Sequence, residues 1–183
     1  MLKSYRAMGA LAVTLLSIGL VFGIYAIRHH RPLLQANKVT GASEALPVAP
    51  EFSLTDLNGQ PLTLSSFHGK VVLIDYWATW CAPCKIEIPR LIVLQKKYEA
   101  QGLQVIGISM DDGPGPVRIF ARELGINYPI ALGNVKVAEA YGGVLGLPIA
   151  FLIDRQGRIY RKLIGDAEMQ WIESDVQKLL RQP

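Results

Sequence analysis

The sequence predicts an α/β fold in which helices flank a mixed central sheet, and three observations carry this prediction. Two near-continuous apolar runs, at residues 71–77 and 103–109, are typical of strands that are covered on both faces. The segment between them, 82–100, has a helical pattern, so the three elements form a βαβ unit. Two later apolar strands flank a turn at 154–157 and predict an antiparallel hairpin, which makes the sheet mixed.

The N-terminal part of the chain predicts a membrane attachment and a linker. Residues 7–27 contain no charged side chain, and a helix of that length would span roughly 30 Å, the hydrocarbon thickness of a bilayer. Basic residues flank both ends of this run, so the charges do not determine its orientation. A cleaved signal peptide is the alternative, but the length of the run favours an uncleaved anchor. We expect an anchor over 1–30, a flexible linker over 31–48 and a folded domain over 49–183.

The folded domain is expected to open with a β-hairpin extension. Apolar and polar residues alternate at 52–55 and 62–64 around Asn58-Gly59, a dipeptide typical of tight turns. A segment rich in Gly and Pro at 111–116 predicts a loop and the start of an insert after the βαβ unit. The later elements follow from the same patterns: a helix over 117–124, a short strand over 128–131, a helix over 135–141, strands over 149–153 and 158–164, and an amphipathic closing helix over 168–181.

The chain has two cysteines, Cys81 and Cys84, which lie three positions apart directly after the strand predicted over 71–77. Cys81 would lie at the first turn of a helix, where unpaired N–H groups and the helix dipole favour a thiolate. Cys84 would lie one helical turn further on and could attack a mixed disulfide formed at Cys81. We interpret the pair as a redox dithiol.

Other chemistries find less support in the sequence. A structural disulfide across two intervening residues would close too short a loop to stabilise the fold much. A structural zinc site needs four ligands, and the remaining candidates are His29, His30 and His68. We therefore expect no metal, and because no flavin or nicotinamide fingerprint such as G-x-G-x-x-G follows a strand, we expect no cofactor. Lys and Arg are scattered, so the net charge of +4 does not predict nucleic-acid binding.

The residues resemble the thioredoxin superfamily, and within it the membrane-anchored TlpA/ResA-like thiol-disulfide oxidoreductases, which include the CcmG/DsbE proteins of cytochrome c maturation. The resemblance covers about residues 49–183. It rests on three segments: the strand and dithiol at 72–84, the Lys85-Ile86-Glu87-Ile88-Pro89 that follows, and 146–154 with Gly157 in the turn. It implies a thioredoxin-like fold and an extracytoplasmic enzyme that exchanges disulfides with client proteins.

The resemblance also implies roles for residues outside the dithiol. Pro148 matches the family's cis-proline, whose loop faces the dithiol and lets a client backbone pair beside it. Leu147 precedes it, where the family often has Thr or Val, and this difference would change which clients fit. Asp75 matches a buried carboxylate beneath the dithiol, whose raised pKa would let it exchange a proton with Cys84. The alternative for Asp75 is a strand-end side chain that reaches solvent or caps a turn.

Two more residues of the expected site lie close to the dithiol in sequence. Glu87 matches an acidic position of the TlpA/ResA-like group and would tune the acidity of the thiols. The alternative is a solvated Glu that the helix dipole favours in the first turn. Trp80 is expected to cover the active site and to offer clients a flat apolar contact, whereas strand alternation places Trp77 in the core.

The expected function is reduction of disulfides in client proteins, with Cys81 attacking and Cys84 resolving. Family resemblance makes apocytochrome c the candidate client, and a membrane dithiol would supply electrons. We expect a single-pass protein of the bacterial inner membrane with its catalytic domain in the periplasm. That compartment is oxidising, and a chain whose only cysteines are the active pair cannot form wrong disulfides there. Thiol oxidation is the alternative direction. A copper chaperone is less favoured, because such chaperones have three residues between their cysteines and this chain has two. A peroxiredoxin is also less favoured, because it would have Pro and Thr where this chain has Ile74 and Ala78.

Overall fold

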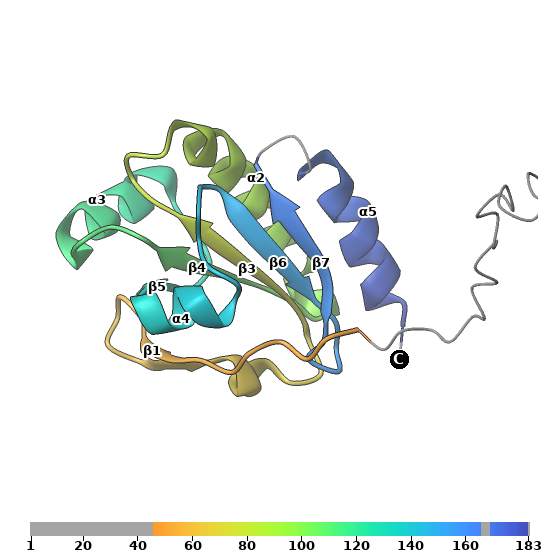
Figure 1. The fold of residues 1–183 in the computed structure, drawn as a ribbon. Helices are drawn as coiled ribbons and strands as arrows, with labels where there is room; N and C mark the ends of the chain where they lie inside the picture. Colours follow the sequence, from red (N-terminus) through yellow and green to blue (C-terminus); the bar gives the residue numbers. More distant parts are fainter. Residues whose placement is uncertain (1–45, 166–168, 183) are drawn as a thin grey trace, which may run out of the picture. The chain divides into compact units, whose positions relative to one another are not determined.

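The computed structural model describes residues 46–165 and 169–182, and a five-stranded mixed sheet lies at its centre (Figure 1). The strand order is β5-β4-β3-β6-β7. The strands β3 (Val71–Trp77), β4 (Leu103–Ser109) and β5 (Ile130–Leu132) are parallel, while β6 (Ile149–Ile153) and β7 (Ile159–Ile164) each pair antiparallel with their neighbour. The predicted mixed sheet is confirmed, and the dithiol strand β3 is its central strand.

Helices and a small hairpin cover the two faces of this sheet (Figure 1). One face carries α2 (Ala82–Tyr98), α3 (Pro114–Leu124) and α5 (Met169–Leu180). The other carries α4 (Val135–Ala140) and a two-stranded sheet of β1 (Ser53–Thr55) and β2 (Pro61–Thr63), followed by the short 3-10 helix η1 (Leu64–Phe67). A second 3-10 helix, η2 (Glu99–Gln101), continues α2.

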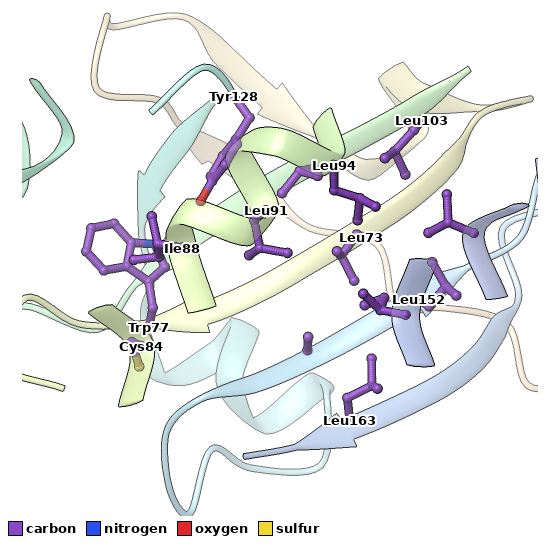
Figure 2. Close-up of a cluster of buried hydrophobic side chains, with 14 of the residues drawn as sticks. Leu73, Trp77, Cys84, Ile88, Leu91, Leu94, Leu103, Tyr128, Leu152 and Leu163 are labelled. Carbon is purple, nitrogen blue, oxygen red and sulfur yellow. The ribbon is translucent and has the colours of Figure 1, made fainter. Parts of the chain in front are cut away.

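The alternation of side chains along β3 divides the core into two clusters. Leu73 and Trp77 belong to the cluster under α2 and α5, and Val72 and Tyr76 belong to the cluster on the opposite face. All seven residues of β3 are buried, as the continuous apolar run predicts. Trp77 is thus in the core, as expected. Figure 2 shows Trp77 at the same end of the first cluster as Cys84.

One boundary differs clearly from the sequence prediction. The loop predicted over 111–116 ends early, because α3 begins at Pro114 after an extended N-cap at Gly113. Proline fits the first turn of a helix, where its missing N–H has no intrahelical partner to lose. The Gly-Pro pattern therefore marks a helix start as well as a turn.

The start of the described residues is held at the end of the sheet remote from the dithiol. The Ala49 N–H donates to the Gly157 carbonyl at 2.9 Å. This turn follows β6, and Ile153 of β6 pairs with Val72 near the beginning of β3. In the same turn the Arg155 guanidinium donates to three carbonyls from different parts of the chain, those of Gly69, Gln101 and Leu180.

None of the helices within residues 46–165 and 169–182 is both long and apolar enough to cross a membrane. The anchor predicted over 7–27 and most of the predicted linker lie outside the described residues.

Candidate active site

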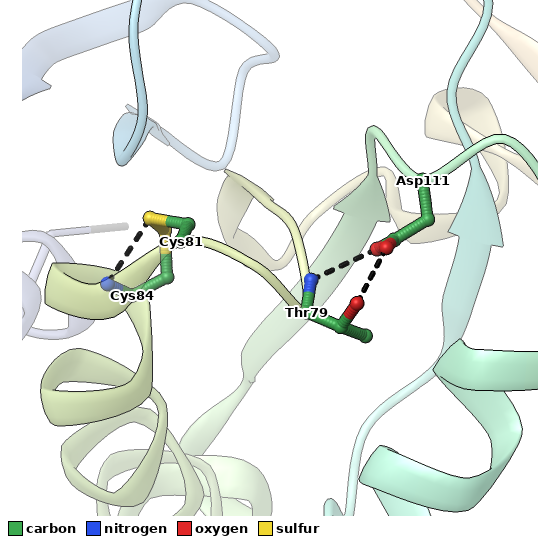
Figure 3. Close-up of a disulfide and its surroundings, with 4 residues drawn as sticks. All are labelled: Thr79, Cys81, Cys84 and Asp111. Carbon is green, nitrogen blue, oxygen red and sulfur yellow. Dashed lines mark hydrogen bonds between the residues drawn. A yellow bond between two sulfur atoms is a disulfide. The ribbon is translucent and has the colours of Figure 1, made fainter.

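The two cysteines lie at the N-terminal end of α2 and are joined by a disulfide, with 5.3 Å between their Cα atoms (Figure 3). Cys81 is the N-cap residue, with an extended backbone, and its Sγ accepts the backbone N–H of Cys84 at 3.2 Å. Pro83 occupies the first turn. The Cys81 sulfur therefore lies at the positive end of the helix dipole, as the spacing predicts.

The two cysteines differ slightly in exposure. Cys81 is 5% exposed and Cys84 is 1% exposed, and both belong to the core cluster beneath α2. The more exposed of the two cysteines is thus the one at the N-cap of α2.

Two carboxyl groups are buried on the α2 side of the sheet. Asp75 alternates onto this face of β3, and its partners in the neighbouring strands are small, Gly107 and Ala150. Asp75 and Glu87 are each 1% exposed. The alternatives that placed Asp75 at a solvated strand end and Glu87 in a solvated first turn are therefore wrong, because β3 and α2 pack these positions inward.

Burial changes the acid–base properties of this region. It raises the pKa of Asp75 well above the ordinary value, and the neighbouring charge of Glu87 raises it further. Neither oxygen of Asp75 has a hydrogen-bond partner among the residues that the structure describes. The Tyr128 hydroxyl is also buried, and its pKa is raised by burial and then by the charges of Asp75 and Glu87. The sequence alone does not single out Tyr128, because a tyrosine at the start of a predicted short strand is typical of an ordinary core position.

An apolar groove lies beside the dithiol. Trp80, which is 68% exposed, lines it together with Leu147. Its other lining residues are Met110, Val144, Gly146 and Leu145, which is 98% exposed. Met110 and residues 144–146 are missed by the sequence reasoning, because isolated apolar residues in loops carry no periodic signal.

The peptide bond between Leu147 and Pro148 is cis, as the resemblance implies. Ile149 pairs with Tyr76 in the sheet, so Pro148 lies level with the end of β3, from which the chain leads to Cys81. The structure thus brings the cis-proline, the groove and the dithiol to one end of the sheet.

A further polar contact holds the residues just before the dithiol (Figure 3). The Asp111 carboxylate accepts the backbone N–H of Thr79 at 2.9 Å and the Thr79 hydroxyl at 2.6 Å. Sequence reasoning treats Asp111 only as the start of a loop. The available signal is its position two residues after the end of β4, because the carboxyl ends of parallel neighbouring strands meet at one edge of a sheet.

This arrangement can carry out two-electron chemistry on sulfur. The dithiol and the disulfide interconvert through attack of a thiolate on a disulfide bond. Within residues 46–165 and 169–182, no cluster of three or more His, Cys, Asp or Glu is arranged to hold a metal ion.

Fold and dithiol together define the class, which is that of the thioredoxin-like thiol-disulfide oxidoreductases. The profile of the AhpC/TSA family matches residues 47–162. The thiol-disulfide oxidoreductase ResA of Bacillus thuringiensis is 33% identical over 131 residues, which make up 72% of this chain and 76% of the relative. The chain belongs to the AhpC/TSA family and is similar there to the ResA-type oxidoreductases.

Solved structures agree with this membership. The crystal structure of a thiol:disulfide interchange protein of the thioredoxin family from Chlorobium tepidum superposes with a TM-score of 0.69 at 28% identity, covering 74% of this chain and 97% of that one. A second Chlorobium tepidum structure, provisionally named thiol:disulfide interchange protein DsbE, gives a TM-score of 0.69 at 32% identity and covers 74% and 96%. The thioredoxin-like fold that the sequence predicts is confirmed.

Proposed function

We propose that this enzyme reduces disulfides in client proteins on the outer face of a bacterial inner membrane, as in cytochrome c maturation. Cys81 is the attacking thiol and Cys84 the resolving thiol. The observation that carries the proposal is the place of Cys81, which is the N-cap of α2 and the more exposed of the two cysteines. A helix N-terminus stabilises a thiolate, and the thiolate is the nucleophile in disulfide exchange.

The reaction balances within the dithiol and its client. The Cys81 thiolate attacks one client sulfur, the client S–S bond breaks, and the other client sulfur leaves as a thiolate that takes a proton from water. Cys84 then loses its proton and attacks Cys81, which forms the Cys81–Cys84 disulfide and releases the second client thiolate. The client gains two electrons and the enzyme loses two. A membrane dithiol donor returns them by the same exchange.

Asp75 is assigned the proton transfer in the second step. A carboxylate with a raised pKa is a stronger base than an ordinary one, so ionised Asp75 is suited to accept the proton of Cys84. Glu87 supports this role, because its charge contributes to the raised pKa of Asp75. The burial of both groups keeps the transfer away from bulk water.

We assign the binding of the client protein to the apolar groove. A client segment with an apolar side chain near its cysteine would place that side chain between Trp80 and Leu147. Pro148 lies where the client backbone would pass, at the end of β3. Apocytochrome c, which carries a CxxCH haem-attachment segment, is the candidate client by family resemblance.

Residues 7–27 are assigned the role of a single membrane anchor that keeps the domain near its electron donor. A reporter fused after Pro183 tests this orientation. Alkaline phosphatase activity from the fusion is expected for an exported domain, and an inactive fusion that is nevertheless produced would refute the periplasmic assignment.

The reduction potential of the Cys81/Cys84 pair tests the direction of electron flow. It is measured by equilibrating the protein with glutathione or dithiothreitol mixtures and quantifying the disulfide. A value near or below roughly −250 mV supports a reductant, whereas a value near roughly −120 mV would make the enzyme an oxidant of client thiols. Cys81→Ser is the control and is expected to abolish exchange with a disulfide-bonded CxxCH peptide.

A further inference from the structure

We propose that Asp111 is a positioning residue for the dithiol, because its carboxylate holds the turn before Cys81 and so determines where the Cys81 sulfur lies at the start of α2. This inference rests on the proposed role of Cys81 as the attacking thiol. It concerns a residue that contacts neither cysteine through a hydrogen bond in the described structure and acts through Thr79 (Figure 3).

The carboxylate of Asp111 is engaged on both oxygens. Oδ2 accepts the Thr79 backbone N–H at 2.9 Å and the Ser109 hydroxyl at 2.8 Å, and Oδ1 accepts the Thr79 hydroxyl at 2.6 Å. The Asp111 N–H donates in turn to the Ser109 oxygen at 3.2 Å. The two contacts with Ser109, at the end of β4, thus orient the carboxylate toward Thr79. Hydrogen bonds to a carboxylate are among the stronger ones.

The turn that Asp111 holds is short and bears the reactive residue. Only residues 78–81 connect the end of β3 to the start of α2. Inside the turn, the Cys81 N–H donates to the Ala78 carbonyl at 3.1 Å. At its base, the Trp77 carbonyl accepts the Met110 N–H at 2.8 Å. The segment that follows β4 is therefore hydrogen-bonded to the turn at two points. Its Met110 backbone binds the Trp77 carbonyl, and its Asp111 side chain binds Thr79.

Loss of the carboxylate has a defined consequence. Thr79 would lose the acceptor of both its N–H and its hydroxyl, and the turn would gain conformational freedom. The Cys81 sulfur would then spend less time at the helix N-terminus, which stabilises its thiolate. A purely electrostatic role predicts the opposite, because removing a negative charge near a thiol favours the thiolate. The direction of the change separates the two roles.

The test follows alkylation of the reduced full-length chain, in mild detergent, by iodoacetamide across about pH 5 to 9. Mass spectrometry identifies which cysteine is labelled, and thermal unfolding is measured in parallel. For Asp111→Ala we expect the midpoint of the pH profile for Cys81 to move upward and its labelling rate near neutral pH to fall about fivefold. Thr79→Val removes the hydroxyl but keeps the backbone bond, so it should shift the midpoint in the same direction by less. The exposed Asp112 provides the matched control, and Asp112→Ala should change nothing.

The ionisable groups near the dithiol, Asp75, Glu87, Tyr128 and Lys85, are identical in all variants, so differences between profiles report on the substituted residue, and their direction separates the turn from the charge. If Asp111→Ala unfolds the chain, Thr79→Val and the isosteric Asp111→Asn carry the same test. A folded variant with an unchanged profile and a lower unfolding temperature would reduce Asp111 to a structural role and overturn the proposal.

A downward midpoint shift in Asp111→Ala would also overturn the proposal, in favour of a charge effect. Labelling of Cys84 ahead of Cys81 in the unaltered chain would instead refute the thiol roles in the proposed function. The failure of the inference and the failure of the proposed function therefore give different results.

Discussion

Asp75→Asn is expected to change how stability depends on pH, because it replaces a buried titratable carboxyl with an amide of nearly the same shape. Asp75 is 1% exposed, and its pKa is raised first by burial and then by the charge of Glu87. A raised pKa means that the folded chain keeps a proton that the unfolded chain has already lost. The stability that this proton contributes is complete below the ordinary aspartate pKa of about 3.9 and is lost as the pH rises through the folded-state pKa.

The size of the effect follows from proton linkage. Between the two pKa values, folded and unfolded chains differ by one bound proton at this site, which corresponds to about 1.4 kcal/mol of unfolding free energy per pH unit. The amide does not titrate. The unfolding free energy of Asp75→Asn minus that of the unaltered protein should therefore become more positive with pH, at up to that slope, and level off above the folded-state pKa.

Urea unfolding of a fragment that begins near Glu44, in steps from about pH 4.5 to 8.5, measures this difference. The Cys81–Cys84 disulfide is kept intact so that neither cysteine titrates. Asp112→Asn, on an exposed side chain, is the matched control and should show no divergence. Parallel curves for Asp75→Asn and the unaltered fragment over the whole range would refute the reasoning, because Asp75 would then hold no extra proton in the folded state.

Three further substitutions test the site and its support. Cys84→Ser should accumulate a mixed disulfide between a client and Cys81, visible as a non-reducing gel adduct that dithiothreitol removes. Trp80→Ala should raise the KM for a protein client about fivefold, for a lost apolar contact of roughly 1 kcal/mol, and leave the reaction with oxidised glutathione unchanged. Gly107→Ala should lower the unfolding free energy by about 1–3 kcal/mol in urea titrations, because its Cβ would lie 2.9 Å from Nε1 of the buried Trp77.

Each of these substitutions has a contrary outcome. A client adduct on Cys84 in Cys81→Ser, with none on Cys81 in Cys84→Ser, would reverse the attacking and resolving roles. Equal losses with protein and glutathione substrates would place Trp80 in the chemistry and not in client binding. An unchanged urea midpoint in Gly107→Ala would show that the indole of Trp77 has room to move.

The central strands of the fold could be predicted closely, because continuous apolar runs in the sequence mark them directly. The strands β3 and β4 begin and end where the apolar runs at 71–77 and 103–109 do. Their composition has one physical explanation, burial on both faces. The start of α3 is harder to predict, since a Gly-Pro pattern is compatible with both a turn and a helix start, and only packing of the following turn decides between them.

The site could be predicted less completely than the fold. Motif position singles out Asp75 and Glu87 but leaves their burial open, because burial depends on how α2 lies on the sheet. The role we infer for Asp111 depends on two strand ends that meet in space, and no local pattern marks such a meeting. The groove is harder still to predict, since Met110 and Leu145 come from loops whose course is determined by the rest of the fold.

The pairing of residue 49 with the turn after β6 has a practical consequence for experiments on surfaces and beads. The strand β3 extends from that end of the sheet to the dithiol, and its seven residues span roughly 20 Å. A support coupled at residue 46 would therefore be attached to the domain about one strand length away from Cys81. In the immobilised enzyme, Cys81 should therefore face the solution. A client could then be captured on the column as a mixed disulfide, washed, and released with reductant.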